Sequence, residues 1–178
     1  MLNKMMITGL LASIGFSSNT LATEGEFYWL PRIGAVMFEN QQYFSDKPSL
    51  QLGLVYGYGL IANFAIEVEG SFSIGGGGYS TTNGAGQYKS WLLGAFGVMR
   101  LPISDRDLYL KAKLGGVYEN ITHITPGAQI EDEVITGRVM QAGLGFGYQF
   151  DSGLSMEVEY VRGETNFDQF LYGMNYMF

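Results

Sequence analysis

The stretch Leu50-Gln51-Leu52-Gly53-Leu54-Val55-Tyr56-Gly57-Tyr58-Gly59-Leu60 places a large apolar side chain at every second position. Successive residues of a β-strand point to opposite faces, so this period predicts a strand with one apolar face and one glycine-rich face. The next stretch, 64–74, repeats the pattern and adds Glu67 and Glu69 to the second face. These two segments favour a β fold whose two surfaces differ sharply.

The same period of two recurs along most of the chain. Eight strands are expected, at 27–38, 50–60, 64–74, 87–101, 108–118, 140–150, 154–161 and 169–178. Short connectors are expected at 61–63, 102–107 and 151–153, and longer ones at 39–48, 75–86 and 119–133, with a compact fourth at 163–168 on the same side. Short turns at one end and longer loops at the other are typical of an all-β, eight-stranded antiparallel up-and-down transmembrane β-barrel.

The size of the apolar side chains decides which face points outward. Leu, Phe, Tyr, Met and Trp fill the apolar face of several strands, and an eight-stranded barrel has little room inside for so many. The glycine-rich face suits a narrow interior, so the apolar face is expected to meet lipid. In strand 87–101 both faces are apolar, and we place Trp91 outward because Arg100 then points inward.

Composition excludes several classes of function. Ten Lys and Arg stand against 17 Asp and Glu, a net charge of −7 that argues against binding of nucleic acid. The chain has no cysteine, which excludes disulfides and thiolate metal sites, and its one histidine, His123, leaves little room for a zinc site. We therefore expect no metal and no cofactor.

The first 22 residues have the layout of a secretory signal peptide. A positively charged start is followed by an apolar run at 5–16, a polar stretch, and the small residues Thr20 and Ala22 around a cleavage position. This run is too short to span a bilayer. Residues 1–22 are therefore expected to be removed on export, which leaves 23–178 as the barrel.

Charged residues inside the predicted strands are the most informative chemistry. Glu67 and Glu69, Lys111 and Lys113, and Glu157 and Glu159 each lie two residues apart and so share one face, which by the phase above is the lumen. Buried charges are costly unless paired, so an interior network is expected. Its members are Arg32, Glu67, Glu69, Arg100, Lys111, Lys113, Glu157 and Glu159. Such a network acts either as a plug, which we favour, or as the lining of a narrow ion or solute pore.

The C-terminal strand 170–178 ends in Phe178, with Tyr176 and Tyr172 in phase before it. This ending is similar to the signal that the barrel-assembly machinery reads in Gram-negative outer-membrane proteins. The stretches Leu108-Tyr109-Leu110-Lys111-Ala112-Lys113-Leu114-Gly115 and Met99-Arg100-Leu101-Pro102 also match that group's strands. The chain thus resembles the small OmpA/OmpX-like outer-membrane β-barrel family, without a peptidoglycan-binding domain.

The resemblance implies a monomer in the bacterial outer membrane, in contact with lipid and lipopolysaccharide, with a structural or surface-interaction role. Apolar and aromatic residues of the long loops are candidate contacts for a host or phage surface ligand: Tyr43, Phe44, Tyr79 and Ile124. Lys47, Lys89 and Arg138 are candidate contacts for lipopolysaccharide phosphates.

Catalysis is the less favoured class. A lipid-modifying enzyme of the membrane would need a base within hydrogen-bond reach of its nucleophile, and only His123 with Ser45 or Ser80 on other loops offers that combination. Glycosidase chemistry by the paired glutamates is disfavoured, because both members of each pair would point into a lumen too narrow for a sugar. We therefore expect no enzymatic activity.

Overall fold

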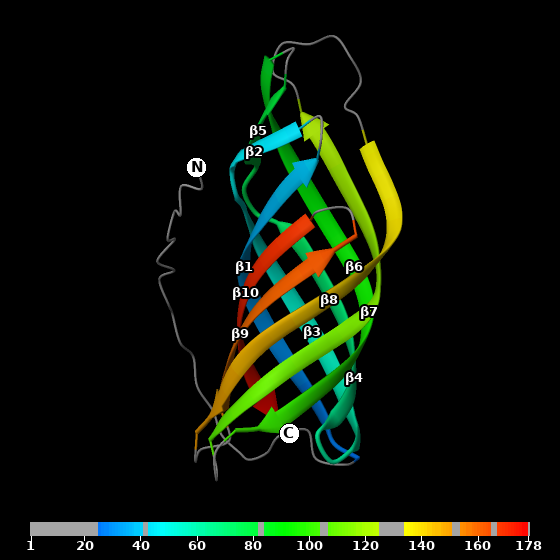
Figure 1. Ribbon diagram of the computed structural model, residues 1–178, viewed down its shortest axis with the longest axis vertical. Helices are drawn as coiled ribbons and strands as arrows, with labels where there is room; N and C mark the ends of the chain where they lie inside the picture. Colours follow the sequence, from blue (N-terminus) through cyan, green and yellow to red (C-terminus); the bar gives the residue numbers. More distant parts are fainter. Residues whose placement is uncertain are drawn as a thin grey trace.

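The computed structural model describes residues 25–40, 43–81, 84–103, 107–124, 134–150, 154–164 and 167–177, and almost all of them lie in strands (Figure 1). The expected signal peptide, residues 1–22, lies outside this range. The strands are β1 (Phe27–Asn40), β2 (Tyr43–Lys47), β3 (Ser49–Ile61), β4 (Phe64–Ser73), β5 (Gly77–Thr81), β6 (Gly84–Pro102), β7 (Leu108–Ile124), β8 (Val134–Gln149), β9 (Leu154–Gly163) and β10 (Phe167–Met177).

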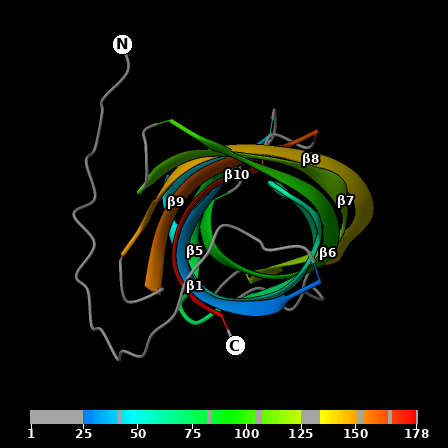
Figure 2. The ribbon, with the colours of Figure 1, turned by 90° about the horizontal axis from the view of Figure 1, so that it is seen from below.

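Eight of these strands close into a ring, in the order β1-β3-β4-β6-β7-β8-β9-β10, and β10 pairs back onto β1 (Figure 2). Every pairing is antiparallel between neighbours along this path, which confirms the expected eight-stranded up-and-down barrel. A closed ring leaves no open sheet edge within its wall, which a structure surrounded by lipid requires.

The first two long connectors are not the loops expected from the sequence. They contain β2 and β5, which pair with each other and with β1 and β6. The pairs Phe44–Ser80 and Gln51–Ser73 have the same register, with a one-residue shift at Lys47–Gly78 between them, so β2 and β5 extend the β3–β4 ladder beyond a break. The break falls at Pro48, which has no N–H to donate, and at 74–76; both interrupt the alternating pattern on which the sequence interpretation depended.

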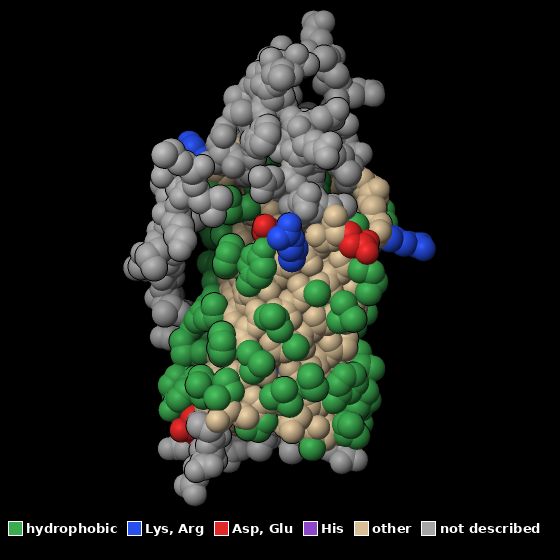
Figure 3. All heavy atoms as spheres, viewed as in Figure 1, with side chains coloured by type: hydrophobic (Ala, Val, Ile, Leu, Met, Phe, Trp, Pro, Cys, Tyr) green, Lys and Arg blue, Asp and Glu red, His purple; other side chains and the backbone are tan. Residues whose placement is uncertain are grey.

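The outer face of the barrel is apolar. Exposed large hydrophobic side chains occur on all eight strands of the ring, and Leu144 at 62 % and Leu114 at 60 % are among the most exposed. Figure 3 shows hydrophobic side chains as a band over the visible face of the wall, with the charged side chains of that face at its borders. Trp91 is exposed and Arg100 is buried, so the two faces of strand 87–101 point outward and inward as expected.

Aromatic side chains form pairs on the outer face near both ends of the barrel. At the short-turn end Phe27 lies 4.7 Å from Tyr58, and Tyr148 lies 4.9 Å from Phe150, between ring centroids. At the long-loop end Trp91 packs against Tyr118 and Tyr160 against Phe170. Transmembrane barrels carry two girdles of aromatic side chains, one at each border of the apolar band, and these pairs have that arrangement. In the described part of the chain, no helix is long and apolar enough to cross a membrane.

Candidate functional site in the barrel interior

All eight charged residues expected in the lumen lie inside the barrel, and each is buried. The four glutamates come from two strands on opposite sides of the ring, Glu67 and Glu69 from β4 and Glu157 and Glu159 from β9. The cations come from the strands between them: Arg32 from β1 on one side, and Arg100, Lys111 and Lys113 from β6 and β7 on the other. The alternation of acidic and basic strands around the ring places opposite charges within reach across the lumen.

Arg32 joins the two acidic strands from one side. Its Nη1 donates to Glu69 Oε2 at 2.9 Å and its Nη2 donates to Glu159 Oε1 at 3.0 Å. Nη2 also lies 3.5 Å from Glu67 Oε2 and 3.7 Å from Glu157 Oε2. One guanidinium therefore contacts all four carboxylates, which its planar set of five N–H donors makes feasible.

The other three cations join the acidic strands from the opposite side. Arg100 donates to Glu67 Oε1 at 2.7 Å through Nη2 and to Glu157 Oε1 at 3.0 Å through Nε. Lys111 donates to Glu157 Oε2 at 2.7 Å and also contacts Glu67 and Glu159. Lys113 donates to Glu69 Oε2 at 2.7 Å and lies 3.1 Å from Glu159 Oε2.

The network is balanced in charge and in contacts. Four cations face four carboxylates, and every carboxylate lies within ion-pair distance of at least two cations. Burial of an isolated charge costs several kcal/mol, and only close pairing with hydrogen bonds offsets that cost. Removal of a single member would leave a buried charge without full compensation.

Two interior tyrosines belong to the network and were missing from the expected set. Tyr28 donates to Glu67 Oε1 at 2.7 Å and accepts from Arg100 Nη1 at 2.9 Å. Tyr109 donates to Glu157 Oε1 at 2.8 Å. The alternation of side chains along the strand could have identified them. Tyr109 lies two residues before Lys111 and Tyr28 lies four residues before Arg32, so each tyrosine shares the inner face of its strand with a network cation.

A glycine on the neighbouring strand makes room for each interior tyrosine. Gly57 is paired with Tyr28, Gly147 with Tyr109, and Gly77 with Tyr88. A Cβ at any of these glycines would lie 2.0–2.2 Å from the Cζ of its tyrosine, closer than real contacts allow. The glycines of the inner face thus admit aromatic rings into a narrow lumen.

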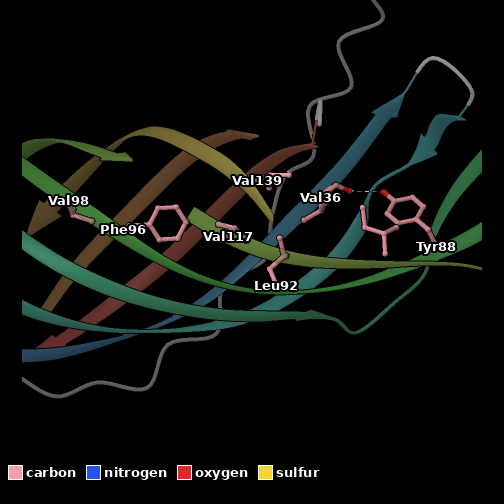
Figure 4. Packing of buried hydrophobic residues seen from close by; sticks show 8 residues of the cluster. Val36, Tyr88, Leu92, Phe96, Val98, Val117 and Val139 are labelled. Carbon is pink, nitrogen blue, oxygen red and sulfur yellow. Dashed lines mark hydrogen bonds between the residues drawn. The ribbon is translucent and has the colours of Figure 1, made fainter. Parts of the chain in front are cut away.

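An apolar cluster continues the packing toward the long-loop end (Figure 4). Phe96 lies beside the network, with Lys113 Nζ 4.4 Å from its ring centroid. The cluster members are Val36, Tyr88, Leu92, Phe96, Val98, Val117, Ile121 and Val139. Tyr88 ends the cluster and donates to the carbonyl of Val36 at 2.9 Å across the lumen.

The remaining expected residues lie along β10 and at the long-loop end of the barrel. Tyr172 is half-buried on the outer face of β10, and Tyr176 pairs in register with Trp29 and Leu154, whereas Phe178 lies outside the described residues. The backbones of Tyr43, Phe44, Tyr79 and Ile124 lie in β2, β5 and the end of β7, at the long-loop end, and their side chains are outside the described residues.

Among the described residues no group of His, Asp and Glu side chains could hold a metal ion. The carboxylates of the four network glutamates are each held by cations. Their arrangement fixes charges in place across the lumen.

Comparison with known proteins agrees with this geometry. A family model described as the outer membrane protein beta-barrel domain matches residues 8–178. No curated protein matches the chain in sequence.

Several solved structures share the fold. Neisserial surface protein A is 12 % identical with a TM-score of 0.62, covering 85 % of this chain and 97 % of that one. OprG of Pseudomonas aeruginosa is 14 % identical with a TM-score of 0.61, covering 88 % and 98 %. Ail, the attachment invasion locus protein of Yersinia pestis, solved with the heparin analogue sucrose octasulfate, is 17 % identical with a TM-score of 0.57, covering 86 % and 97 %. At these identities the likeness concerns the fold. The family match over nearly the whole chain, together with a closed barrel that is apolar outside and charged inside, shows that this chain belongs to the outer-membrane β-barrel proteins of bacteria.

Proposed function

We propose that this outer-membrane protein acts through its surface, in membrane integrity, adhesion or lipopolysaccharide contact, and that its interior is plugged. The observation that carries the proposal is the charge network, which joins β4 to β9 across the lumen through Arg32 on one side and Arg100, Lys111 and Lys113 on the other. The apolar cluster above it adds a second packed layer.

Passage of an ion through such a lumen requires pairs to separate. Separating one member of a buried pair from its partners costs about 3–5 kcal/mol, because the remaining charge stays buried. An eight-stranded barrel has room inside for little beyond its own side chains. A steady conducting state is therefore disfavoured against the closed one.

The long-loop end of the barrel is suited to contact with a partner outside the membrane. Strands β6 and β7 are 19 and 17 residues long, and β2 and β5 add a further pair of strands at this end. We infer that Tyr43, Phe44, Tyr79 and Ile124 contact a host or phage surface from this extension, since aromatic and other apolar residues are common anchors in binding sites. Glu131, Asp132 and Glu133 give the third loop an acidic character, so a polyanion like the ligand of Ail is a poor candidate for it.

The proposal includes no enzymatic role. His123 of β7 pairs in register with Tyr88 of β6. Ser80 of β5 pairs with Ala85 of β6, on the other side of that strand. Two strand spacings and three residue steps separate the two backbones, a Cα distance of about 14 Å. That distance is too long for direct proton transfer between the two side chains without a bridging group.

We also infer that the barrel functions as a monomer and that Tyr172, Tyr176 and Phe178 are read by the barrel-assembly machinery. The ring closes through β1 and β10 of one chain, so no second copy is needed to complete it. Replacement of Phe178 by Ala should slow assembly in cells while the purified chain still refolds in detergent. An unchanged rate of assembly would argue against this signal.

Planar-bilayer recording tests the plug directly. The mature protein should show no sustained conductance. The double variant Glu69→Ala with Lys113→Ala opens space in the lumen without leaving an unpaired charge, so it is the comparison in which a conducting state is easier to detect. Leu144→Ala on the outer face is the control that leaves the lumen intact. Sustained channels in the unaltered protein would contradict the plug and support the narrow pore.

Trimming the third loop tests the surface role. Residues 125–133 are replaced by a two-residue turn, and binding to host cells and phage is measured beside the heat-dependent gel mobility of the folded barrel. We expect adhesion to fall while the mobility shift persists, because the β7–β8 ladder begins at Thr122 and Val134. Unchanged binding would refute a role for this loop.

A further inference from the structure

The seam between β1 and β10, which closes the ring, has a gap in its ladder. Seven successive residue pairs join the two strands on the long-loop side of the gap, beginning at Arg32. Two pairs join them on the short-turn side, Tyr28–Met177 and Trp29–Tyr176. Between these runs, within the described part of both strands, Leu30 and Pro31 are not paired with β10.

The gap has one cause, the proline at residue 31. The register places Pro31 opposite Met174, and proline has no N–H to donate to the carbonyl across from it. On its other side β1 pairs with β3 without a break, and Pro31 itself pairs with Leu54. The missing donor therefore faces β10, and it leaves the carbonyl of Met174 without a hydrogen bond from β1.

Side chains at the short-turn end of β1 contact strands other than β10. The ring of Phe27 lies 4.7 Å from that of Tyr58 on β3, between centroids. Tyr28 donates to Glu67 of β4 and accepts from Arg100 of β6. These contacts do not depend on the pairing of β1 with β10, so they persist when the two strands separate.

Each strand also stays anchored to its other neighbour. The N–H of Gly25 donates to the carbonyl of Gly59 at 2.9 Å, and the N–H of Gly59 donates to the carbonyl of Glu26 at 3.0 Å, so the contact with β3 continues beyond the start of β1. On the other side, β10 pairs with β9 as far as Tyr176 and Leu154. Separation on the short-turn side of Pro31 therefore breaks only the two seam pairs there.

On the long-loop side of the gap the seam is held firmly. Arg32 follows Pro31 directly, and its guanidinium contacts all four buried carboxylates of the lumen. Two residues further on, the strands pack so closely that a Cβ at Gly34 would lie 2.6 Å from Leu171 Cδ2. Separation that begins at the short-turn end therefore stops at Arg32.

We propose that Pro31 makes the short-turn end of the seam an opening point, at which residues 27–30 of β1 and 174–177 of β10 separate reversibly in the folded barrel. Each opening frees the main-chain donors and acceptors along one edge of 174–177, at the end that faces the periplasm in outer-membrane barrels. Few bonds break, so this segment belongs to the least stable part of the wall. The opening requires no ion pair of the lumen to separate, and it is therefore distinct from the proposed plug and surface role.

Amide hydrogen exchange, measured by NMR on the mature protein in lipid nanodiscs, tests the opening. Trp29 and Ile33 lie two residues to either side of Pro31, so their amides face β10, and the amides of their partners Tyr176 and Tyr172 face β1. In the unaltered protein Trp29 and Tyr176 should exchange at least about tenfold faster than Ile33 and Tyr172. Pro31→Ala supplies the missing donor and should slow exchange at Trp29 and Tyr176 about three- to tenfold, the contribution of one net hydrogen bond.

Pro102→Ala is the matched control. The N–H of Arg100 donates to the carbonyl of Asn63 at 2.8 Å, so residue 102, two positions on, faces the same side of β6, beyond the pair Phe64–Met99 that ends the ladder with β4. An N–H at residue 102 completes no ladder pair, and exchange at the seam should change less than about twofold.

Both variants must keep the heat-dependent gel mobility of the folded barrel. Equal exchange on the two sides of the gap in the unaltered protein would overturn the proposal, because the seam would then open as one unit. Equal slowing by the two proline substitutions would also overturn it, because the effect would then come from the chain and not from the restored bond. Exchange at the seam is measured without reference to conductance or adhesion, so its failure leaves the proposed function to its own tests.

Discussion

Tyr109 of β7 lies directly across from Gly147 of β8, and a Cβ at residue 147 would lie 2.0 Å from the Tyr109 Cζ. The glycine therefore determines where the ring lies, and the ring in turn places its hydroxyl 2.8 Å from Glu157 Oε1. A glycine of β8 thereby supports a hydrogen bond from β7 to β9, the two strands on either side of it.

Gly147→Ala should displace Tyr109 and destabilise the barrel by about 1–3 kcal/mol, through overpacking and the weakened hydrogen bond to a charged group. Gly116→Ala is the control, because a Cβ there points outward and meets only Met140 Sδ at 4.0 Å. Urea unfolding in lipid vesicles measures both. Equal stability of the two variants would mean that the ring moves aside without loss.

Arg32→Met should cost about 3–5 kcal/mol, because it leaves four buried carboxylates facing three cations. Adding Glu69→Gln restores the balance of three against three, so the double variant should be more stable than the sum of the single effects predicts, by about 1–3 kcal/mol. A double-mutant cycle in urea gives this coupling. Arg162→Met, at an exposed pair, should stay within about 0.5 kcal/mol, and a comparable loss there would show that the assay does not report on the interior.

Alternation in the sequence was enough to assign faces. The phase that put Arg32, Lys111 and Glu157 inward is the phase observed, because lipid outside and a narrow space inside leave each strand one acceptable orientation. Even β6, apolar on both faces, is fixed by the cost of turning Arg100 outward into lipid.

The partners within the network could not be predicted in the same way. Four carboxylates and four cations allow many pairings, and the choice depends on strand order and stagger, which bring β1 between the two acidic strands. The strands β2 and β5 were missed because Pro48 and Gly75 interrupt the side-chain period, whereas the strand pairing resumes beyond them after a register shift between Ser45 and Lys47.

Leu144→Arg tests the orientation of the wall. Leu144 is 62 % exposed on β8 between the two aromatic borders, so a charge there should cost about 2–4 kcal/mol in lipid. Thr136→Arg, on the same strand and face but beyond Tyr118, should cost about 0–1 kcal/mol. Unfolding in vesicles compares the two variants, and equal small costs would mean that the apolar face does not meet acyl chains.

Closure of the ring between β1 and β10 can be tested by an engineered disulfide, since the chain has no cysteine of its own. Ile33 and Tyr172 are paired across this seam and lie on the outer face, so Ile33→Cys with Tyr172→Cys should cross-link readily on oxidation. Ile33→Cys with Met174→Cys keeps the face but shifts the partner by two residues, to about 7–8 Å, and should cross-link poorly. Gel mobility with and without reductant measures both. Preferred cross-linking of the shifted pair would require a different stagger between β1 and β10. The register of β1 against β10 sets the height at which Arg32 meets Glu159, so a different stagger would give Arg32 a different set of partners across the lumen.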